Sequence, residues 1–243
     1  MESSVKITLI KSATVLIILL AIAAFYFSIK PSNTVNANGV AEIEVMPDVT
    51  ALYFYIETEA ATATLAKDLN SEVYDEFLLA LIKEGFDRDE IETQSYNVRP
   101  YSEWEDDEYV EKGYKAEHRI RVKMDTEDTS KIGEAIDAGV NNGALLQYMN
   151  FELSQEKENE YKAEALKQAT QDARIKAESI AEGLNKRVGR LVSVSTSDFD
   201  YRPWRMYEAS VDESAAVMKE SAVSIQPSKQ TINARVSVRY TLR

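Results

Sequence analysis

The sequence predicts an α+β domain in which helices pack on one face of an antiparallel or mixed β-sheet, preceded by a single N-terminal transmembrane helix. Stretches with apolar residues at every second position, typical of half-buried strands, alternate with stretches whose apolar residues recur every third or fourth position, typical of helices. The order of these stretches is ββαββαβαββ. A run of 17 uncharged, mostly apolar residues near the N-terminus has the length of a short membrane-spanning helix.

The apolar run, residues 13–29, follows Lys6 and Lys11 and precedes Lys30. Lysines before such a run favour a cytoplasmic N-terminus and an extracytoplasmic body. A cleaved signal peptide is the alternative, because Ala21-Ile22-Ala23 resembles a cleavage site. Either way the body lies outside the cytoplasm, as a single-pass membrane protein or as a secreted or periplasmic one. We expect a cytoplasmic segment at 1–12, an anchor at 13–29, a polar linker at 30–38 and one domain at 39–243.

The composition argues against several classes of protein. The chain has 28 Lys and Arg against 41 Asp and Glu, one His and no Cys. The acidic balance argues against a nucleic-acid partner, which needs a basic surface. A chain without cysteine has no disulfide, thiolate zinc site or cysteine nucleophile. The motifs of serine hydrolases, zinc peptidases and phosphate-binding loops do not occur, and we expect no cofactor.

Residues 40–56 predict two strand patterns separated by a corner. Met46-Pro47-Asp48 lies between the two patterns. Because proline cannot donate a hydrogen bond to a β-ladder, it belongs at an edge, a bulge or a turn. We interpret the stretch as one bent strand or as two strands joined at this corner. The apolar positions are Val40, Ile43 and Val45 in the first pattern and Leu52, Phe54 and Ile56 in the second.

A helix is predicted from Thr62 to Glu84, because apolar residues recur every four positions and Gly85 is a typical stop. Residues 91–101 are predicted to be extended, residues 103–113 to form an acidic loop, and residues 114–124 to form a strand in which apolar and charged positions alternate. The apolar stripe of the helix consists of Leu65, Leu69, Val73, Phe77 and Leu81, widened by Leu78 and Ile82.

The second half predicts two more helices and three strands. Helices are expected at 129–141 and at about 157–182, and strands at 145–153, 188–195 and 232–242. Residues 197–229 are expected to be irregular. The longer helix has small residues at every fourth position, which permit close approach of another element of the chain or of a neighbouring subunit. These residues are Ala165, Ala169, Ala173, Ala177 and Ala181.

Gly39 to Asp48, GVAEIEVMPD, resembles the N-terminal signature of the SIMPL domain family, in which a glycine and a strand are followed by Pro-Asp before a second strand. No single motif is diagnostic, but the ordered set is specific and covers essentially all of 39–243. Ser228-Lys229 departs from the family's more frequent Gly-Glu, which alters a turn only. The resemblance continues through 90–93 (EIET), 113–114 (GY), 137–139 (DAG), 163–183, 202–207 (RPWRMY) and 225–227 (IQP).

The resemblance implies an extracytoplasmic bacterial protein of α+β fold. Relatives are exported or associated with the envelope, and some are described in oxidative-stress defence or as surface antigens. The family has no established catalytic residue, so none is carried over. Self-association is implied by analogy, and Pro47-Asp48 is best interpreted as a structural corner of the family fold.

The residues most suited to chemistry have structural explanations. His118, the sole imidazole, lies on the apolar face of its predicted strand and is expected to be a satisfied core or sheet-edge residue. A metal site or a Ser-His-Asp triad would have to use it, so we predict no metal and no catalytic residue. A carboxylate cluster within 103–113 lacks the spacing and the turn glycine of a calcium loop and is expected to be solvated. Opposite it, Lys115, Arg119, Arg121 and Lys123 either face these carboxylates or receive an anion. The cluster comprises Glu103, Glu105, Asp106, Asp107, Glu108 and Glu111.

The best candidate for an interaction site lies in the long predicted loop. Trp, Tyr and Arg are the usual energetic anchors of interfaces, and loops of this length in compact domains are often functional. The alternative is that Trp204 and Met206 pack the loop onto the sheet. The candidate residues are Tyr201, Arg202, Trp204, Arg205, Met206 and Tyr207.

We therefore expect a non-enzymatic, membrane-anchored interaction or scaffold module of the bacterial envelope, with the membrane and further copies of the chain as partners. One alternative is a small-ligand-binding envelope protein that uses residues 197–229 as a lid. The other is a carboxylate-based hydrolase, which requires two converging carboxyl groups, at least one with a perturbed pKa.

Overall fold

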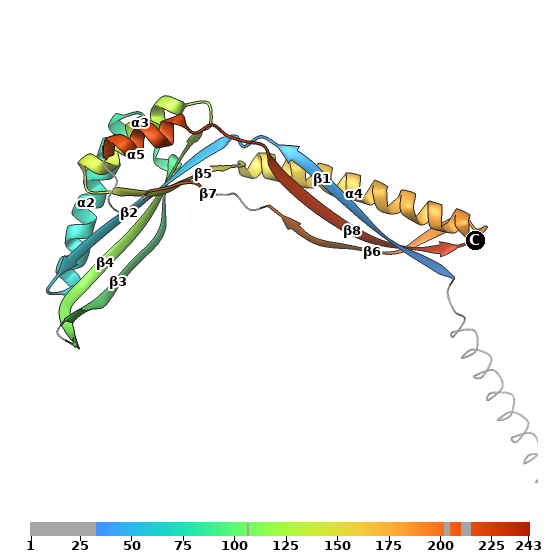
Figure 1. Cartoon of the computed structure of the whole chain (residues 1–243), viewed down its shortest axis with the longest axis horizontal. Helices are drawn as coiled ribbons and strands as arrows, with labels where there is room; N and C mark the ends of the chain where they lie inside the picture. Colours follow the sequence, from blue (N-terminus) through green and yellow to red (C-terminus); the bar gives the residue numbers. More distant parts are fainter. Residues whose placement is uncertain (1–32, 106, 202–204, 210–214) are drawn as a thin grey trace, which may run out of the picture. The chain divides into compact units, whose positions relative to one another are not determined.

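The computed structural model describes residues 33–105, 107–201, 205–209 and 215–243 (Figure 1). They form two compact units. The three-stranded unit comprises the described residues up to Val40, with Ala169–Ser197 and Arg235–Arg243, and the five-stranded unit comprises Ala41–Gln168 and Asp198–Ala234. The elements are β1 (Thr34–Val45), β2 (Val49–Ala60), α2 (Ala63–Lys83), the short 3-10 helix η1 (Arg88–Glu90), β3 (Ile91–Glu105), β4 (Glu108–Asp125), α3 (Thr129–Asn141), β5 (Leu145–Glu152), α4 (Gln155–Gly183), β6 (Val188–Asp200), β7 (Arg205–Glu208), α5 (Ala215–Ser224) and β8 (Gln230–Leu242).

The five-stranded unit contains an antiparallel sheet in the order β3-β4-β2-β5-β7. Its strands alternate between two faces, as the period-2 pattern predicts. Helices α2 and α3 pack on one face, and α5 packs against α3 (Figure 1). The core lies between the helices and this face of the sheet. Its largest fully buried side chains include Leu52, Phe54, Ile56, Phe77, Leu81, Ile120, Ile136 and Phe151.

Helix α2 begins and ends where the sequence predicts, but its buried stripe differs. Thr62 Oγ1 accepts a hydrogen bond from the Leu65 amide at 3.3 Å, and Gly85 follows the helix in the left-handed region at φ 84°. Leu65 is 50% exposed, because Ala66 and Asn70 face the sheet in the first half of the helix. The buried Asn70 amide donates to backbone carbonyls of β2 and β4, which places a polar residue inside the predicted apolar stripe.

The corner at Met46-Pro47-Asp48 joins two different sheets, which corrects the expectation of a single sheet. β1 belongs to the three-stranded sheet, whereas β2 lies within the five-stranded one. The Asp48 amide donates to the Glu152 carbonyl and the Asp48 carbonyl accepts from the Thr126 amide, both at 3.1 Å. A proline before Asp48 costs no ladder hydrogen bond here, so the structural interpretation of this corner is confirmed.

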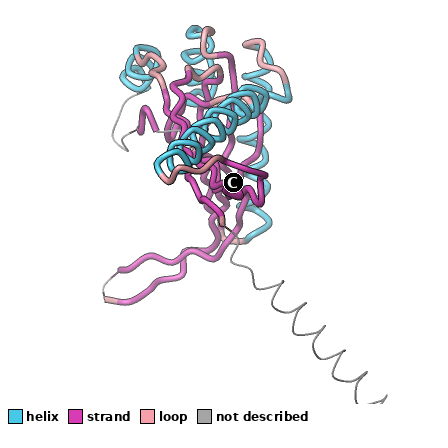
Figure 2. Tube along the Cα trace, turned by 90° about the vertical axis from the view of Figure 1, so that its right-hand side faces the viewer, coloured by secondary structure: helices cyan, strands magenta, loops and turns pink. Residues whose placement is uncertain are grey.

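The predicted acidic loop at 103–113 is a β-ribbon instead. β3 and β4 stay paired as far as Glu105 opposite Glu108, while β2 pairs with β4 only as far as Ala60 opposite Tyr114. Residues 101–105 and 107–113 therefore extend beyond the sheet as a two-stranded hairpin, which we call the arm (Figure 2). The high β propensity of its aromatic residues favours strands despite the low propensity of its acidic residues. A strand exposed to solvent can carry charge on both faces.

The three-stranded unit contains strands in the order β1-β8-β6, covered on one face by α4 (Figure 1). The alanine row of α4 is at most 1% exposed, and Val236 and Val238 are buried in β8. A Cβ on Gly39 would lie 1.8 Å from the Ala169 carbonyl oxygen, so glycine is required for this approach of strand and helix. The alanine row thus serves packing within the chain.

The expectation that residues 197–229 are irregular is wrong. β6 continues to Asp200, β7 pairs with β5 at the edge of the five-stranded sheet, and α5 packs on α3 with Ala222 fully buried. β7 has only four residues, too few for a detectable period-2 pattern. The predicted anchor, 13–29, lies outside the described residues; within those, no helix is long and apolar enough to cross a membrane.

Candidate functional site

The face of the five-stranded sheet opposite the helices is polar. Tyr53 and Tyr55 of β2 point to this face because they alternate with the buried Leu52, Phe54 and Ile56. Arg121 and Arg119 of β4 lie opposite Tyr53 and Tyr55 in the ladder. Glu92 of β3 lies across from Arg121, and Glu152 of β5 lies across from Val49. This arrangement, the polar face, brings together side chains that are far apart in sequence.

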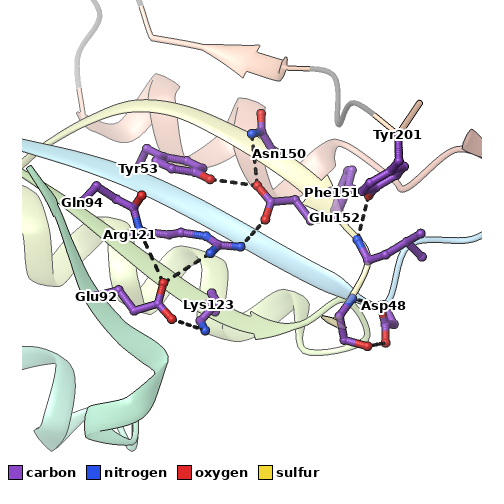
Figure 3. A network of polar contacts seen from close by, with 12 residues as sticks. Asp48, Tyr53, Glu92, Gln94, Arg121, Lys123, Asn150, Phe151, Glu152 and Tyr201 are labelled. Carbon is purple, nitrogen blue, oxygen red and sulfur yellow. Dashed lines mark hydrogen bonds and ion pairs between the residues drawn. The ribbon is translucent and has the colours of Figure 1, made fainter. Parts of the chain in front are cut away.

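Arg121 is the centre of a hydrogen-bonded network on the polar face (Figure 3). Its guanidinium forms ion pairs with Glu152 and, at 3.3 Å, with Glu92, and Glu92 also pairs with Lys123. The Tyr53 hydroxyl donates to the Glu152 carboxylate at 2.8 Å. Three strands thus contribute charges that neutralise one another. Asn150 adds a hydrogen bond to the same Glu152 oxygen at 3.2 Å.

The electrostatics of this network hold the charges in place. The hydrogen bond from Lys123 and the neighbouring positive charges keep the pKa of Glu92 below its usual value. Burial disfavours the charge of Arg121, but Glu152 and the other acidic neighbours raise the pKa of Arg121 above its usual value. Burial and the adjacent Glu152 raise the pKa of the Tyr53 hydroxyl, which therefore stays a hydrogen-bond donor at neutral pH.

A cavity of about 600 Å³ opens beside the network. Tyr201 closes one side, where its hydroxyl accepts a hydrogen bond from the Leu153 amide at 2.8 Å, and burial raises its pKa to about 12. The Arg121 Nε atom, which is buried, has no hydrogen-bond partner within the part of the chain that the structure describes. The cavity is lined by residues of both charges, among them Glu92, Arg121, Lys123, Ser154, Glu158 and Tyr201.

Asp48 positions the wall of this cavity. Its carboxylate accepts hydrogen bonds from the amide and the hydroxyl of Ser154, both at 2.7 Å. The Ser154 hydroxyl in turn accepts from the Lys157 amide at 3.2 Å, which caps the N-terminus of α4. The Pro-Asp corner therefore fixes where α4 starts. The sequence does not predict that Asp48 lies near Arg121, because their proximity depends on strand register.

The predicted interaction residues are separated by the fold. Met206 and Tyr207 lie on β7 and pack against the core, as the packing alternative predicted for Met206. Arg205 pairs through its backbone with Asn150 of β5. Tyr201 lines the cavity. Arg202 and Trp204 lie outside the described residues, so the interaction role of this segment stays a prediction.

His118 is a core residue, as expected. It is 7% exposed and forms a hydrogen bond to Thr93 Oγ1 at 2.9 Å. Tyr74 and Tyr96 flank its ring at centroid distances of 4.6 and 5.2 Å. Burial lowers its pKa, so the ring is neutral at neutral pH.

The ion pairs of Lys115, Arg121 and Lys123 are with carboxylates of neighbouring strands rather than with those of the arm. Lys115 contacts Glu57 at 2.7 Å and Glu59 at 3.0 Å. Arg119 lies over the Tyr55 ring, 5.8 Å from its centroid. The arm carboxylates Glu103 and Glu105 contact Lys112 at 4.0 and 2.6 Å. Among the described residues, no group of three acidic or histidine side chains is placed to hold a metal ion.

Two antiparallel sheets, one long alanine-rich helix and a polar face on which charged side chains of several strands pair with one another define an α+β protein. The chain belongs to the SIMPL family, described as proteins of unknown function (DUF541), whose model matches residues 35–240.

Relatives of this chain share the family and a substantial part of its length. The chain is 28% identical over 179 residues to the uncharacterised protein YggE of Edwardsiella ictaluri, covering 72% of this chain and 74% of that protein. It is 23% identical over 180 residues to YggE of Escherichia coli K12, covering 74% and 72%. It is 24% identical over 216 residues to the 26 kDa periplasmic immunogenic protein of Brucella melitensis, covering 86% and 84%.

Proposed function

We propose that this protein is a non-enzymatic interaction module of the bacterial cell envelope that associates with further copies of itself. The observation that carries the proposal is the outer strand β6 of the three-stranded sheet. Its Leu191, Val192 and Val194 are exposed by 52%, 52% and 50%. An exposed edge strand with apolar side chains is a template for pairing with another chain, and proteins usually shield such edges.

The polar face supports a non-enzymatic role. A carboxylate-based hydrolase needs one carboxyl group that is protonated near neutral pH, with a raised pKa. Glu92 has a lowered pKa, and both Glu92 and Glu152 are paired with Arg121. This arrangement suits a rigid structural surface better than proton transfer.

The location proposed for the protein is extracytoplasmic. A relative that covers 86% of this chain is named a periplasmic protein. Attachment to the membrane would come from the lysine-flanked apolar run at 13–29. A contribution to envelope or oxidative-stress tolerance is proposed from the resemblance to the family alone.

The test is the mass of the full chain by light scattering across a hundredfold concentration range. We expect a defined oligomer, and we expect Val192→Lys with Val194→Lys to shift it toward single chains. Ile175→Lys is the matched control, because Ile175 is 61% exposed on α4 and not on the edge strand. The pair Trp204→Ala and Arg205→Ala tests the predicted interaction loop in the same assay. A mass equal to one chain at every concentration would refute self-association.

The cavity on the polar face favours a second candidate function, binding of a small ligand that carries both charges. Arg121 and Lys123 face it with positive charge and Glu158 with negative charge. Tyr201 belongs to the segment expected to act as a lid. Free amino acids have this charge pattern, so thermal unfolding with added L-alanine, L-glutamate and L-lysine is the probe. A rise in Tm that Lys123→Met removes and Lys83→Met keeps would support it; an unchanged Tm with all three would exclude this ligand class.

A further inference from the structure

The arm is an element without a partner in its own sheet. Beyond Tyr114 its two strands pair only with each other, and both of its faces are largely exposed. Gly113 has φ 112°, and a Cβ there would lie 2.4 Å from the Ala60 carbonyl oxygen, at the register shift where the arm leaves the sheet. A two-stranded ribbon alone is marginally stable in water. The glycine and the bulge direct the arm away from the sheet. This geometry suits an element that is stabilised by contact with another surface.

The arm carries the residue types that anchor interfaces. Trp104 and Tyr109 lie opposite each other, with ring centroids 4.7 Å apart in an edge-to-face arrangement, and are exposed by 58% and 76%. Glu111 lies two positions along the same strand from Tyr109 and so shares its face, whereas Glu108, next to the tip, lies on the other face by the same alternation. The complement of such a surface is an apolar patch with arginines, which pair with carboxylates and stack on aromatic rings.

Charge is distributed very unequally between the two units. The five-stranded unit has 17 Lys and Arg against 37 Asp and Glu, a formal side-chain charge of −20. Residues 33–40, 169–197 and 235–243 have eight Lys and Arg against three Asp and Glu, a formal charge of +5. All three of those carboxylates are on α4. A protein with a pI near 4.7 thus has one basic sheet.

The face of the three-stranded sheet that points away from α4 combines this positive charge with apolar side chains. Arg235 and Arg239 alternate with the buried Val236 and Val238 and are exposed. Arg187 and Arg243 exchange both backbone hydrogen bonds, so β6 runs antiparallel to β8 and Leu191 falls opposite Arg239.

On the other side of β8, Asn36 of β1 accepts a hydrogen bond from Arg239 Nε at 2.7 Å. Val40, four residues further along β1, shares that face and is 47% exposed. None of the three strands contributes an Asp or Glu within this unit. We call the surface formed by Val40, Leu191, Arg235 and Arg239 the arginine face.

We propose that the arm of one copy docks on the arginine face of a second copy. The inference rests on the proposed self-association and names a further contact for it, one that covers Leu191 of β6. Trp104 and Tyr109 lie against the apolar side chains and stack on the guanidinium groups. Glu111 pairs with the arginines, and Glu108 adds negative charge at the tip of the arm. The contact joins two different surfaces, so a docked pair still has one arm and one arginine face available for further copies. The assembly is therefore a ring or a filament.

Charge reversal tests this contact on the full chain. Arm-reversed chains carry Glu108→Lys and Glu111→Lys; face-reversed chains carry Arg235→Glu and Arg239→Glu. Each variant alone has like charges on both surfaces, so we expect at least a tenfold weaker association. Mixed together, the arm-reversed chain meets the face-reversed one with opposite charges, and we expect association to return as mixed oligomers. Unfolded variants cannot produce this rescue, and circular dichroism checks each fold beforehand.

The control reverses two exposed charges elsewhere in the five-stranded unit, Glu84→Lys with Asp89→Lys, and should associate as the native chain does. Raising NaCl from about 0.1 M to about 1 M, which shortens the Debye length from roughly 10 Å to roughly 3 Å, should also dissociate the native oligomer. A native oligomer that both reversals leave intact would overturn the arm contact while self-association stands. A native chain that never associates would overturn both proposals. Weakened variants without rescue on mixing would also count against the arm contact.

Discussion

Glu152 shows how one side chain organises the polar face. It is 7% exposed and receives hydrogen bonds or ion pairs from Tyr53, Asn150 and Arg121. Glu152→Ala would leave the Arg121 charge half-buried with one fewer carboxylate. Because loss of one partner of a buried pair is costly, we expect a loss of about 2–4 kcal/mol in the free energy of unfolding, measured by denaturant titration.

Two further variants make this prediction specific. Glu152→Gln keeps an acceptor for Tyr53 and should lose less stability than the alanine variant. Glu160→Ala removes the carboxylate of an exposed ion pair with Lys157 on α4 and should change stability little. Equal losses in Glu152→Ala and Glu160→Ala would contradict the central role of Glu152.

Glu92 leads to a prediction about pH. Its pKa in the folded chain lies below the usual 4.5 because of Lys123 and Arg121. A lowered pKa means that the folded state favours the ionised carboxylate, so its contribution exists above the unfolded pKa and is lost as the pH falls through the folded value. We expect the native chain to be more stable than Glu92→Gln at pH 7, and this difference to shrink at acidic pH as Glu92 becomes protonated. A difference that stays constant as the pH falls would show that proton binding at Glu92 is not involved.

At the scale of the elements, local patterns were predictive where one face is buried. The corner at Pro47, the ends of α2 and the alanine row of α4 all follow from sequence, because each depends on neighbouring residues or on a regular spacing. The arm was missed because charge on both faces hides a period-2 pattern. The sequence predicts one sheet where the structure has two, because no local pattern shows that the chain changes sheet after β1.

The candidate site was predictable only in part. Arg121 and Lys123 were assigned to the polar face of their strand from alternation alone. Their partners Glu92 and Glu152 were not, because the pairing depends on register across β3, β4, β2 and β5. Tyr201 was singled out for its interaction chemistry, whereas its position beside this network is a consequence of tertiary structure.

The packing of α4 on its sheet supports an element-scale prediction. Ala173 is fully buried, and its Cβ would lie 2.8 Å from a Cβ placed on Gly39. A larger side chain therefore has to push β1 away. We expect Ala173→Leu to lower the free energy of unfolding by about 1–3 kcal/mol. Gln171→Leu, at an exposed position of the same helix, should have a small effect, and comparable losses in both would contradict the packing argument.

At the scale of the whole molecule, net charge opposes folding of the five-stranded unit. An excess of 20 negative side-chain charges repels itself in the compact state. The ion pairs on the polar face offset part of this repulsion, but salt screens those partly buried pairs less than it screens separated surface charges. Added salt should therefore weaken the repulsion between surface carboxylates more than it weakens the attraction within the ion pairs.

We expect the Tm of the full chain, measured at low protein concentration, to rise between about 10 mM and about 150 mM NaCl, over which the Debye length falls from roughly 30 Å to roughly 8 Å. The variant with Glu84→Lys and Asp89→Lys changes the charge of the five-stranded unit by four units and should show a smaller rise. If instead the Tm falls with salt, the ion pairs outweigh the repulsion, and the acidic surface would be a source of stability. If the Tm rises equally in both chains, the effect of salt is unrelated to the excess charge.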